Sequence, residues 1–175
     1  IQSDFKIPIP NNLQNKLENI FNVNYKYIGI APGAGEKNKI WPLDKFIEVG
    51  KFYESKGYKI VLYLGPDEQH LKNRLKHSFH KPLLPEEIIN DYSNIEIVIG
   101  STKYLSCALA NDSGISHMLS SRYCPLVKLF GPKDSNKFTP KNDFLKTISS
   151  KEFNSNEVSI IPVEKVLSSI NKFLY

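Results

Sequence analysis

Residues 104–117 read YLSCALANDSGISH, an apolar run that leads directly into a polar turn and the start of a second segment. An apolar run without polar alternation is typical of a strand that is buried on both faces, as strands of a parallel sheet are. Asp112 and Ser113 are residue types that cap helices, and a helix is predicted over 115–121. The stretch therefore predicts a strand, a polar turn and a helix in succession.

Segments with the same character recur along the chain. Strands are predicted over 25–31, 58–64 and 126–130, with weaker candidates at 145–148 and 158–161. Helices are predicted over 43–55, 68–79 and 163–173, after a leading helix capped by Asn11 or Asn12. No element is assigned to the ambiguous segment 80–94. Apolar strands that alternate with helices predict an α/β, Rossmann-like fold, a parallel sheet with helices on both faces.

Length and composition fit one domain, or one domain with an appendage. The chain has 175 residues, of which 41% are hydrophobic, so it can bury a core. No stretch approaches the ~20 consecutive apolar residues of a membrane-spanning helix. Residues 1–10 lack the basic start and apolar centre of a signal peptide and resemble an extended linker. We therefore expect a cytoplasmic protein.

The charge distribution argues against a nucleic-acid partner. Lys and Arg number 23 against 18 Asp and Glu, a formal net charge of +5. Only Arg74 and Arg122 are arginines, and the lysines are spread along the whole chain, whereas nucleic-acid-binding proteins cluster basic residues and favour Arg. A mildly basic face still suits phosphate-bearing ligands or an anionic membrane surface. Cys107 and Cys124 have no metal-type spacing and fit a reducing compartment.

The turn after the first predicted strand is a candidate phosphate site. The backbone amides of Gly33, Ala34 and Gly35 lie between a strand and a helix, where amides and the helix dipole attract phosphate. Lys39 adds a cation, whereas Lys37 is interpreted as a surface lysine. The glycine pattern is incomplete, because Asn38 stands where a dinucleotide fingerprint has its third glycine. A plain strand-to-helix connection remains the alternative.

Two further turns occupy equivalent positions after strands, and ligands bind outside the carboxyl ends of such strands. Asp112, the adjacent amides and His117 could together hold sugar hydroxyls and phosphate oxygens, or they could be a cap and a structural histidine. Glu68 either stabilises a helix start or accepts the two hydroxyls of a ribose. Cys107 lies inside a strand without an assignable base, which favours a buried apolar role over a nucleophile.

Four segments in order carry a resemblance to a known family. They read PGAGEKNKIWPLDKF (32–46), YLGPDE (63–68), ANDSGISHM (110–118) and PLVKLFGPKD (125–134). Together they resemble the carboxyl-terminal domain of glycosyltransferase family 9, which contains the ADP-heptose:lipopolysaccharide heptosyltransferases. The matching motifs are Lys39-Ile40-Trp41-Pro42, Asp112-Ser113-Gly114-x-x-His117 and Phe130-Gly131-Pro132-x-Asp134. Lys133 departs from the family, which commonly has Thr or Ser there.

This resemblance implies the carboxyl-terminal half of a GT-B glycosyltransferase, in which two Rossmann-like domains hold the substrates between them. It implies an interdomain linker and leading helix over 1–24 and a nucleotide-sugar-binding domain over 25–175. The implied roles are pyrophosphate contacts for Lys39 and His117, phosphate-binding amides at Ser113 and Gly114, the donor sugar for Asp112 and the ribose for Glu68. No metal and no cofactor are implied.

The resemblance also implies that the acceptor site and the catalytic carboxylate lie outside these residues. In such enzymes the acceptor site and the proposed catalytic carboxylate belong to an amino-terminal domain, so we expect no catalytic base here and no activity of this chain alone. The expected donor is a nucleotide sugar, with ADP-heptose as the leading candidate. The expected acceptor is a glycolipid, which allows contact with the cytoplasmic face of the inner membrane. The alternatives are a non-catalytic nucleotide-binding module and a GT-B enzyme that uses another nucleotide sugar.

Overall fold

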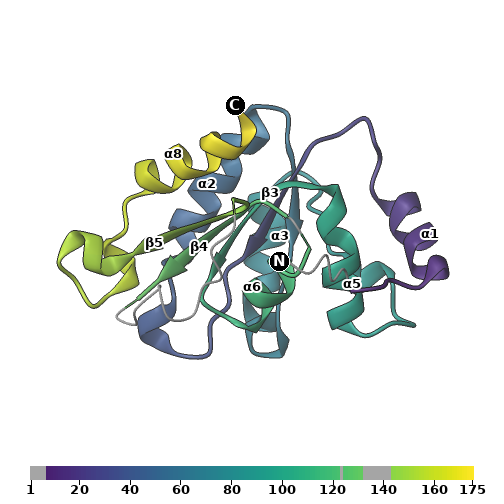
Figure 1. Ribbon diagram of the computed structural model, residues 1–175, viewed down its shortest axis with the longest axis horizontal. Helices are drawn as coiled ribbons and strands as arrows, with labels where there is room; N and C mark the ends of the chain where they lie inside the picture. The colour runs from purple at the N-terminus through teal and green to yellow at the C-terminus, as the bar shows by residue number, and fades with distance from the viewer. Residues whose placement is uncertain (1–6, 123, 132–142) are drawn as a thin grey trace.

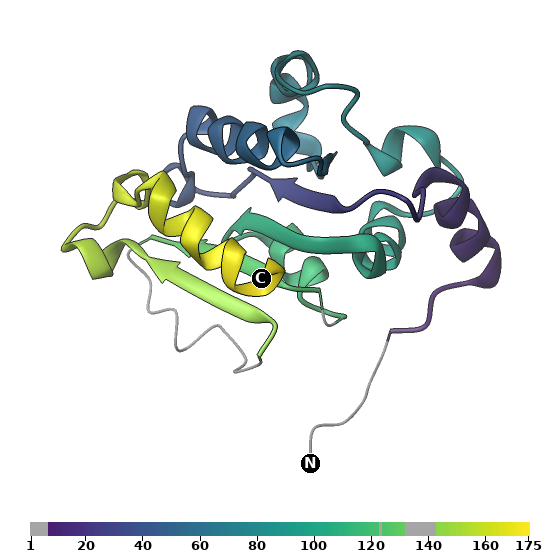
Figure 2. The ribbon, with the colours of Figure 1, turned by 90° about the horizontal axis from the view of Figure 1, so that it is seen from above.

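Five parallel strands form a single sheet in the computed structural model, which describes residues 7–122, 124–131 and 143–175. The strands are β1 (Tyr27–Ala31), β2 (Lys59–Leu62), β3 (Leu105–Asn111), β4 (Leu126–Phe130) and β5 (Leu145–Ser149). Their order across the sheet is β2-β1-β3-β4-β5, and every neighbouring pair is parallel. The arrowheads of β1 and β5 accordingly point the same way in Figure 2. The parallel sheet expected from the apolar runs is confirmed.

Helices cover both faces of this sheet. They are α1 (Asn11–Ile20), α2 (Leu43–Ser55), α3 (Lys72–Ser78), α4 (Pro85–Ile88), α5 (Asn94–Ser101), α6 (Gly114–Leu119) and α8 (Val163–Leu174). In Figure 1, α2 and α8 lie together over one side of the sheet, whereas α1 and α5 lie together at the other end of the molecule. Among the described residues, no helix is long and apolar enough to cross a membrane.

Successive residues of β1 enter two separate cores. Ile28 and Ile30 belong to the core beneath α2 and α8, whereas Tyr27 and Ala31 belong to the core beneath α1, α5 and α6. All five residues of β1 are buried. Burial of each aliphatic side chain contributes ~1.5–3 kcal/mol, so apolar residues are favoured at every position of a strand that is covered on both faces. This explains the uninterrupted apolar runs of the sequence.

Some sequence-based boundaries require correction. The leading helix begins after Pro10, and neither Asn11 nor Asn12 caps it with a side chain. The helix expected over 68–79 is a 3₁₀ helix (Pro66–Leu71) followed by α3. The weak strand expected at 158–161 is wrong, because Val158–Ile160 forms a 3₁₀ turn in which the Ile160 N–H donates to Glu157. Pro162 follows this turn and cannot donate to a strand ladder.

The sequence analysis did not predict α5. Its residues, NIEIVIGS, are rich in β-branched side chains, which favour strands. The helix forms because Ser93 and Glu96 make a reciprocal capping box and because its apolar side chains pack against α1 and α4. Leu13 and Leu17 of α1 are fully buried in the same core. The leading helix is therefore packed into the body of the domain.

The order in which strands are added to the sheet reverses between β1 and β3. From β1 the chain proceeds to β2 on one side, and then returns to β3 on the other side. Such a switch point leaves a crevice outside the carboxyl ends of the two strands. Asn111, the last residue of β3, is fully buried there. Its side-chain Oδ1 accepts from the backbone N–H of Trp41 at 3.1 Å, and its Nδ2 donates to the Pro32 carbonyl at 2.7 Å.

Replacement of Asn111 should therefore destabilise the protein. Asn111→Ala leaves the Trp41 N–H and the Pro32 carbonyl without partners in the interior, and an unsatisfied buried polar group costs ~1–3 kcal/mol. We expect the free energy of unfolding, measured by urea denaturation, to fall by about 2–3 kcal/mol. The control is Asn22→Ala, whose side chain accepts from the Asn24 N–H at an exposed position. Equal losses in both variants would contradict the bridging role of Asn111.

Candidate functional site

The three polar turns singled out in the sequence meet at the carboxyl edge of the sheet, after β1, β2 and β3. The amide of Asn111 joins the turn after β1 to the turn after β3. Glu68, which follows β2, reaches Gly33 in the turn after β1. The sequence-predicted site residues are therefore brought to one edge from three separate segments of the chain, 33–39, 65–68 and 112–117.

Two glycines make room for the carboxylate of Glu68. A Cβ atom added to Gly33 would lie 2.4 Å from Glu68 Cδ, and one added to Gly65 would lie 2.5 Å from Glu68 Oε2. Any side chain at either position would therefore displace the carboxylate. Within the described ranges, no hydrogen bond or ion pair holds this carboxylate. Its oxygens are consequently available to a ligand at the edge of the crevice.

Gly35 differs from Gly33 in its surroundings. A Cβ atom added to Gly35 would meet no atom within 4 Å, and the residue is exposed. The same is true of Gly114 at the start of α6. Neither glycine is required by the packing of the chain. Their small size leaves the backbone of both turns open to solvent or to a ligand.

A reciprocal capping box starts α6. Ser113 Oγ accepts from the Ser116 N–H at 3.3 Å, and Ser116 Oγ accepts from the Ser113 N–H at 3.2 Å. The capping role considered for Ser113 is thus confirmed. The Ser113 amide already has an acceptor, whereas no acceptor for the Gly114 amide exists in the part of the chain that is described. The Gly114 N–H is the amide of this turn that is better placed for a phosphate oxygen.

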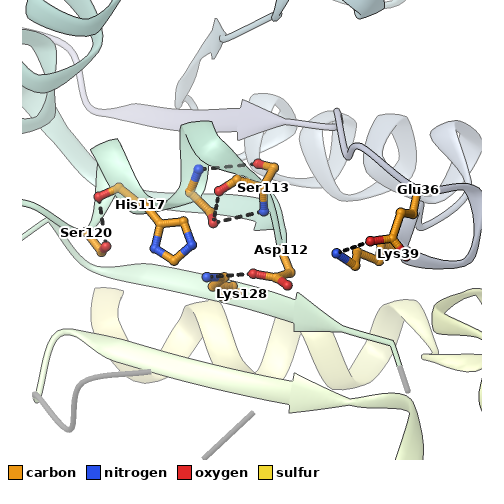
Figure 3. Close-up of polar contacts among 8 residues, drawn as sticks. Glu36, Lys39, Asp112, Ser113, His117, Ser120 and Lys128 are labelled. Carbon is orange, nitrogen blue, oxygen red and sulfur yellow. Dashed lines mark hydrogen bonds and ion pairs between the residues drawn. The ribbon is translucent and has the colours of Figure 1, made fainter. Parts of the chain in front are cut away.

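Lys39 lies at the end of the short helix Lys37–Lys39, and its side chain is only 15% exposed. Its Nζ forms an ion pair with Glu36 Oε1 at 2.8 Å. Lys37 is exposed, as the sequence analysis expected. Lys39 is therefore the more enclosed of the two lysines, and it lies on the same side of the sheet edge as Asp112 in Figure 3.

Lys128 is a site residue that the sequence analysis missed. It is located within β4, and its Nζ forms an ion pair with Asp112 Oδ1 at 2.9 Å. In Figure 3 the side chains of Asp112, Lys128 and His117 lie next to one another. The sequence feature that could have revealed it is a lysine inside an otherwise apolar strand, LVKLF, because lysines are rarely buried without a partner.

The imidazole of His117 is exposed on α6 beside this ion pair. Partial burial lowers the pKa of His117 below its usual value, the Lys128 ammonium lowers it further, and the Asp112 carboxylate opposes both effects. A lowered pKa favours the neutral form of His117, in which the imidazole carries a single N–H donor.

Cys107 and two histidines of the described chain are not part of this site. Cys107 is fully buried in β3, and burial raises the pKa of its thiol, which excludes a reactive thiolate. The rings of His70 and His77 are exposed and contact carbonyls of their own helices. Within the described ranges, no group of three His, Cys, Asp or Glu residues could hold a metal ion. Pro132 to Asp134, from the last motif, lie outside the described residues.

Comparison with known proteins identifies relatives over most of the chain. A model of glycosyltransferase family 9 (heptosyltransferase) matches residues 2–166. Lipopolysaccharide heptosyltransferase 3 of Escherichia coli is 24% identical over 165 residues, which are 87% of this chain and 48% of that protein. The chain thus spans about half the length of this curated relative.

Solved structures have the same fold. The glycosyltransferase family 9 structure from Veillonella parvula superposes with a TM-score of 0.82 at 19% identity, covering 97% of this chain and 53% of that one. The E. coli heptosyltransferase WaaC with ADP superposes with a TM-score of 0.73 at 20% identity, covering 92% of this chain and 48% of that one. The five-stranded sheet with helices on both faces is therefore the arrangement found in half of each of these proteins.

Proposed function

This chain belongs to glycosyltransferase family 9 (heptosyltransferase), and from that premise we propose that it is the nucleotide-sugar-binding part of an inverting heptosyltransferase in lipopolysaccharide or related glycan biosynthesis. The observation that carries the proposal is the convergence of the three polar turns at the switch point between β1 and β3. Crevices of this kind bind nucleotides in Rossmann-like folds. The proposed donor contacts are Gly33, Ala34, Gly35, Lys39, Glu68, Asp112, Ser113, Gly114 and His117.

Each part of a nucleotide sugar finds a chemically suitable group along this edge. The carboxylate of Glu68 accepts hydrogen bonds from the two ribose hydroxyls. Lys39, the neutral His117 and the Gly114 amide donate to the pyrophosphate. The carboxylate of Asp112 accepts from a hydroxyl of the donor sugar. Hydrogen bonds in which one partner is charged are roughly twice as strong as neutral ones, so these contacts fix both the position and the orientation of the donor.

The same contacts would assist the reaction. An acceptor hydroxyl attacks the anomeric carbon, the bond to the phosphate oxygen breaks, and a nucleoside diphosphate leaves with the bonding electrons. Negative charge grows on the leaving phosphate, where Lys39 and His117 are positioned to donate. Preorganised donors of this kind lower a barrier because they need no rearrangement as charge develops. The base that removes the acceptor proton would come from another domain of the enzyme.

The proposed donor is ADP-heptose. The structural neighbour WaaC was solved with ADP, which supports an adenosine diphosphate as the nucleotide part of the donor. The proposed acceptor is a glycolipid, which would bring the enzyme to the membrane surface. The second candidate is a nucleotide-binding module without transfer activity, because none of the proposed contacts among the described residues is assigned as a base.

The phosphate contacts can be tested in this chain. Lys39→Ala and His117→Ala should each weaken ADP binding about tenfold or more in calorimetric titrations, because a hydrogen bond to a charged group contributes ~1.5–3 kcal/mol. Lys37→Ala is the matched control, since it removes an exposed lysine from the same short helix. Wild-type affinity in both site variants would exclude these pyrophosphate contacts.

The ribose contact can be tested without altering Glu68 itself. Gly33→Ala places a methyl group where the Glu68 carboxylate lies, and the flexible glutamate side chain should move away rather than the loop. We expect ADP to bind about tenfold more weakly, while binding of inorganic pyrophosphate is unchanged. The pyrophosphate titration of the same variant is the internal control, because pyrophosphate has no ribose for Glu68 to bind. Equal effects on ADP and pyrophosphate would point to a distorted loop instead.

Transfer activity should require more than the 175 residues. In the proposed arrangement the acceptor site and the general base belong to another domain. They supply positioning and proton transfer, which together account for many orders of magnitude in rate. We expect no product when this chain is incubated with ADP-heptose and a lipopolysaccharide-core acceptor and analysed by mass spectrometry. Steady turnover by the chain alone would show that a base lies within it.

A further inference from the structure

Lys128 is the only Lys, Arg, Asp or Glu that is buried within the described ranges. Its side chain is 4% exposed, and its Nζ contacts Asp112 Oδ1 at 2.9 Å. The Nζ also lies 4.9 Å from the centroid of the Phe130 ring, which adds a weaker attraction to the cation. Asp112 is the single acceptor that the described structure provides for three ammonium N–H groups.

Stability alone does not explain a lysine at this position. Removal of an ammonium and a carboxylate from water costs several kcal/mol per ion, and apolar residues of similar volume often stabilise a protein as well or better. The neighbours of Lys128 on the same face of β4, Leu126 and Phe130, are fully buried and apolar. An apolar residue at position 128 would continue the core. The lysine is therefore better explained by what it does to Asp112.

The register of the sheet directs Lys128 towards Asp112. Lys128 pairs with Ala110 across the β3–β4 ladder, so both side chains lie on the same face of the sheet. Asp112 follows Ala110 by two residues, at the carboxyl edge where the candidate site lies. Because Ala110 has a short side chain, the lysine can extend along this face to the edge. The ion pair thus connects the buried face of β4 to the candidate site.

We propose that Lys128 is a positioning residue for Asp112. The Lys128 ammonium holds carboxylate oxygen Oδ1 of Asp112, so that Oδ2 faces the donor sugar. The same ammonium offsets the carboxylate charge beside the donor pyrophosphate. This inference rests on the proposed function. An uncompensated Asp112 would repel a nucleoside diphosphate in the same crevice, because like charges a few ångströms apart repel strongly when water is excluded. With Lys128 in place, the carboxylate contributes recognition of a hydroxyl without that penalty.

A second consequence concerns His117 and needs no ligand. Lys128 from β4 and Asp112 from the turn after β3 are the charged groups that act on the imidazole. From α5, which also packs against α6, the charged residue is Glu96, and its carboxylate is held by Ser93 at the start of that helix. Removal of the Lys128 charge leaves Asp112 as the dominant charge, so the pKa of His117 should rise.

Ligand binding provides the main test. In calorimetric titrations, Lys128→Met should weaken ADP binding about tenfold, because Asp112 is left uncompensated. In the double variant Lys128→Met/Asp112→Asn, which removes both charges, ADP affinity should return to within about threefold of the wild type. The same double variant should lose the preference of the wild type for ADP-heptose over ADP. The control is Lys146→Met, which removes an exposed lysine from the neighbouring strand β5.

The pKa of His117, measured by NMR titration, distinguishes positioning from a merely structural role. It should rise in Lys128→Met and stay at the wild-type value in Lys146→Met. The inference is overturned if Lys128→Met binds both ligands like the wild type, or if the His117 titration does not change. If Lys128→Met does not fold, a double variant that keeps the wild-type preference for ADP-heptose overturns it equally. A wild-type chain that binds no ADP would instead refute the proposed function, and the His117 titration alone would then decide the role of Lys128.

Discussion

The side-chain amide of Asn111 is the contact on which the candidate site depends. Its Oδ1 accepts from the backbone N–H of Trp41 and its Nδ2 donates to the Pro32 carbonyl, and both partners belong to the loop after β1. Asn111 itself is the last residue of β3. The loops after β1 and β3 are thereby held together at the switch point. Trp41, whose N–H is one of the partners, is itself fully buried, and its indole donates to the Ile161 carbonyl at 2.9 Å. The loop that carries the proposed phosphate contacts, residues 32–41, is thus held by hydrogen bonds at both of its ends.

Balanced charge is the second feature of this edge. Asp112 is paired with Lys128, and Glu36 is paired with Lys39. The carboxylates therefore do not accumulate negative charge where an anionic ligand would bind. Glu68 follows β2 and lies against Gly33 and Gly65, where the ribose rather than the pyrophosphate is proposed to bind. In the proposed binding mode, this arrangement separates the carboxylate that would accept from hydroxyls from the cations that would bind phosphate.

The sequence predicted the bounds of a helix or strand correctly where a single local pattern of residues specified that element. The bounds of α2 and β4 agree with the prediction, because a regular apolar period and a continuous apolar run each have one structural interpretation. The prediction failed for α5, whose strand-favouring residues are overridden by a capping box and by packing against α1 and α4. It failed also at 158–161, where a proline ends the segment and the backbone turns.

By itself, the sequence determined the alternating architecture, the positions of the three polar turns after strands and the membership in glycosyltransferase family 9, because each depends on residue order and short-range spacing. Only the tertiary structure decided that Lys128 pairs with Asp112, that Asn111 joins two loops and that Glu68 lies over two glycines. These contacts depend on strand order and register, which bring together segments that are distant along the chain. No local pattern of residues specifies which buried lysine meets which carboxylate, since that is set by the packing of the whole sheet.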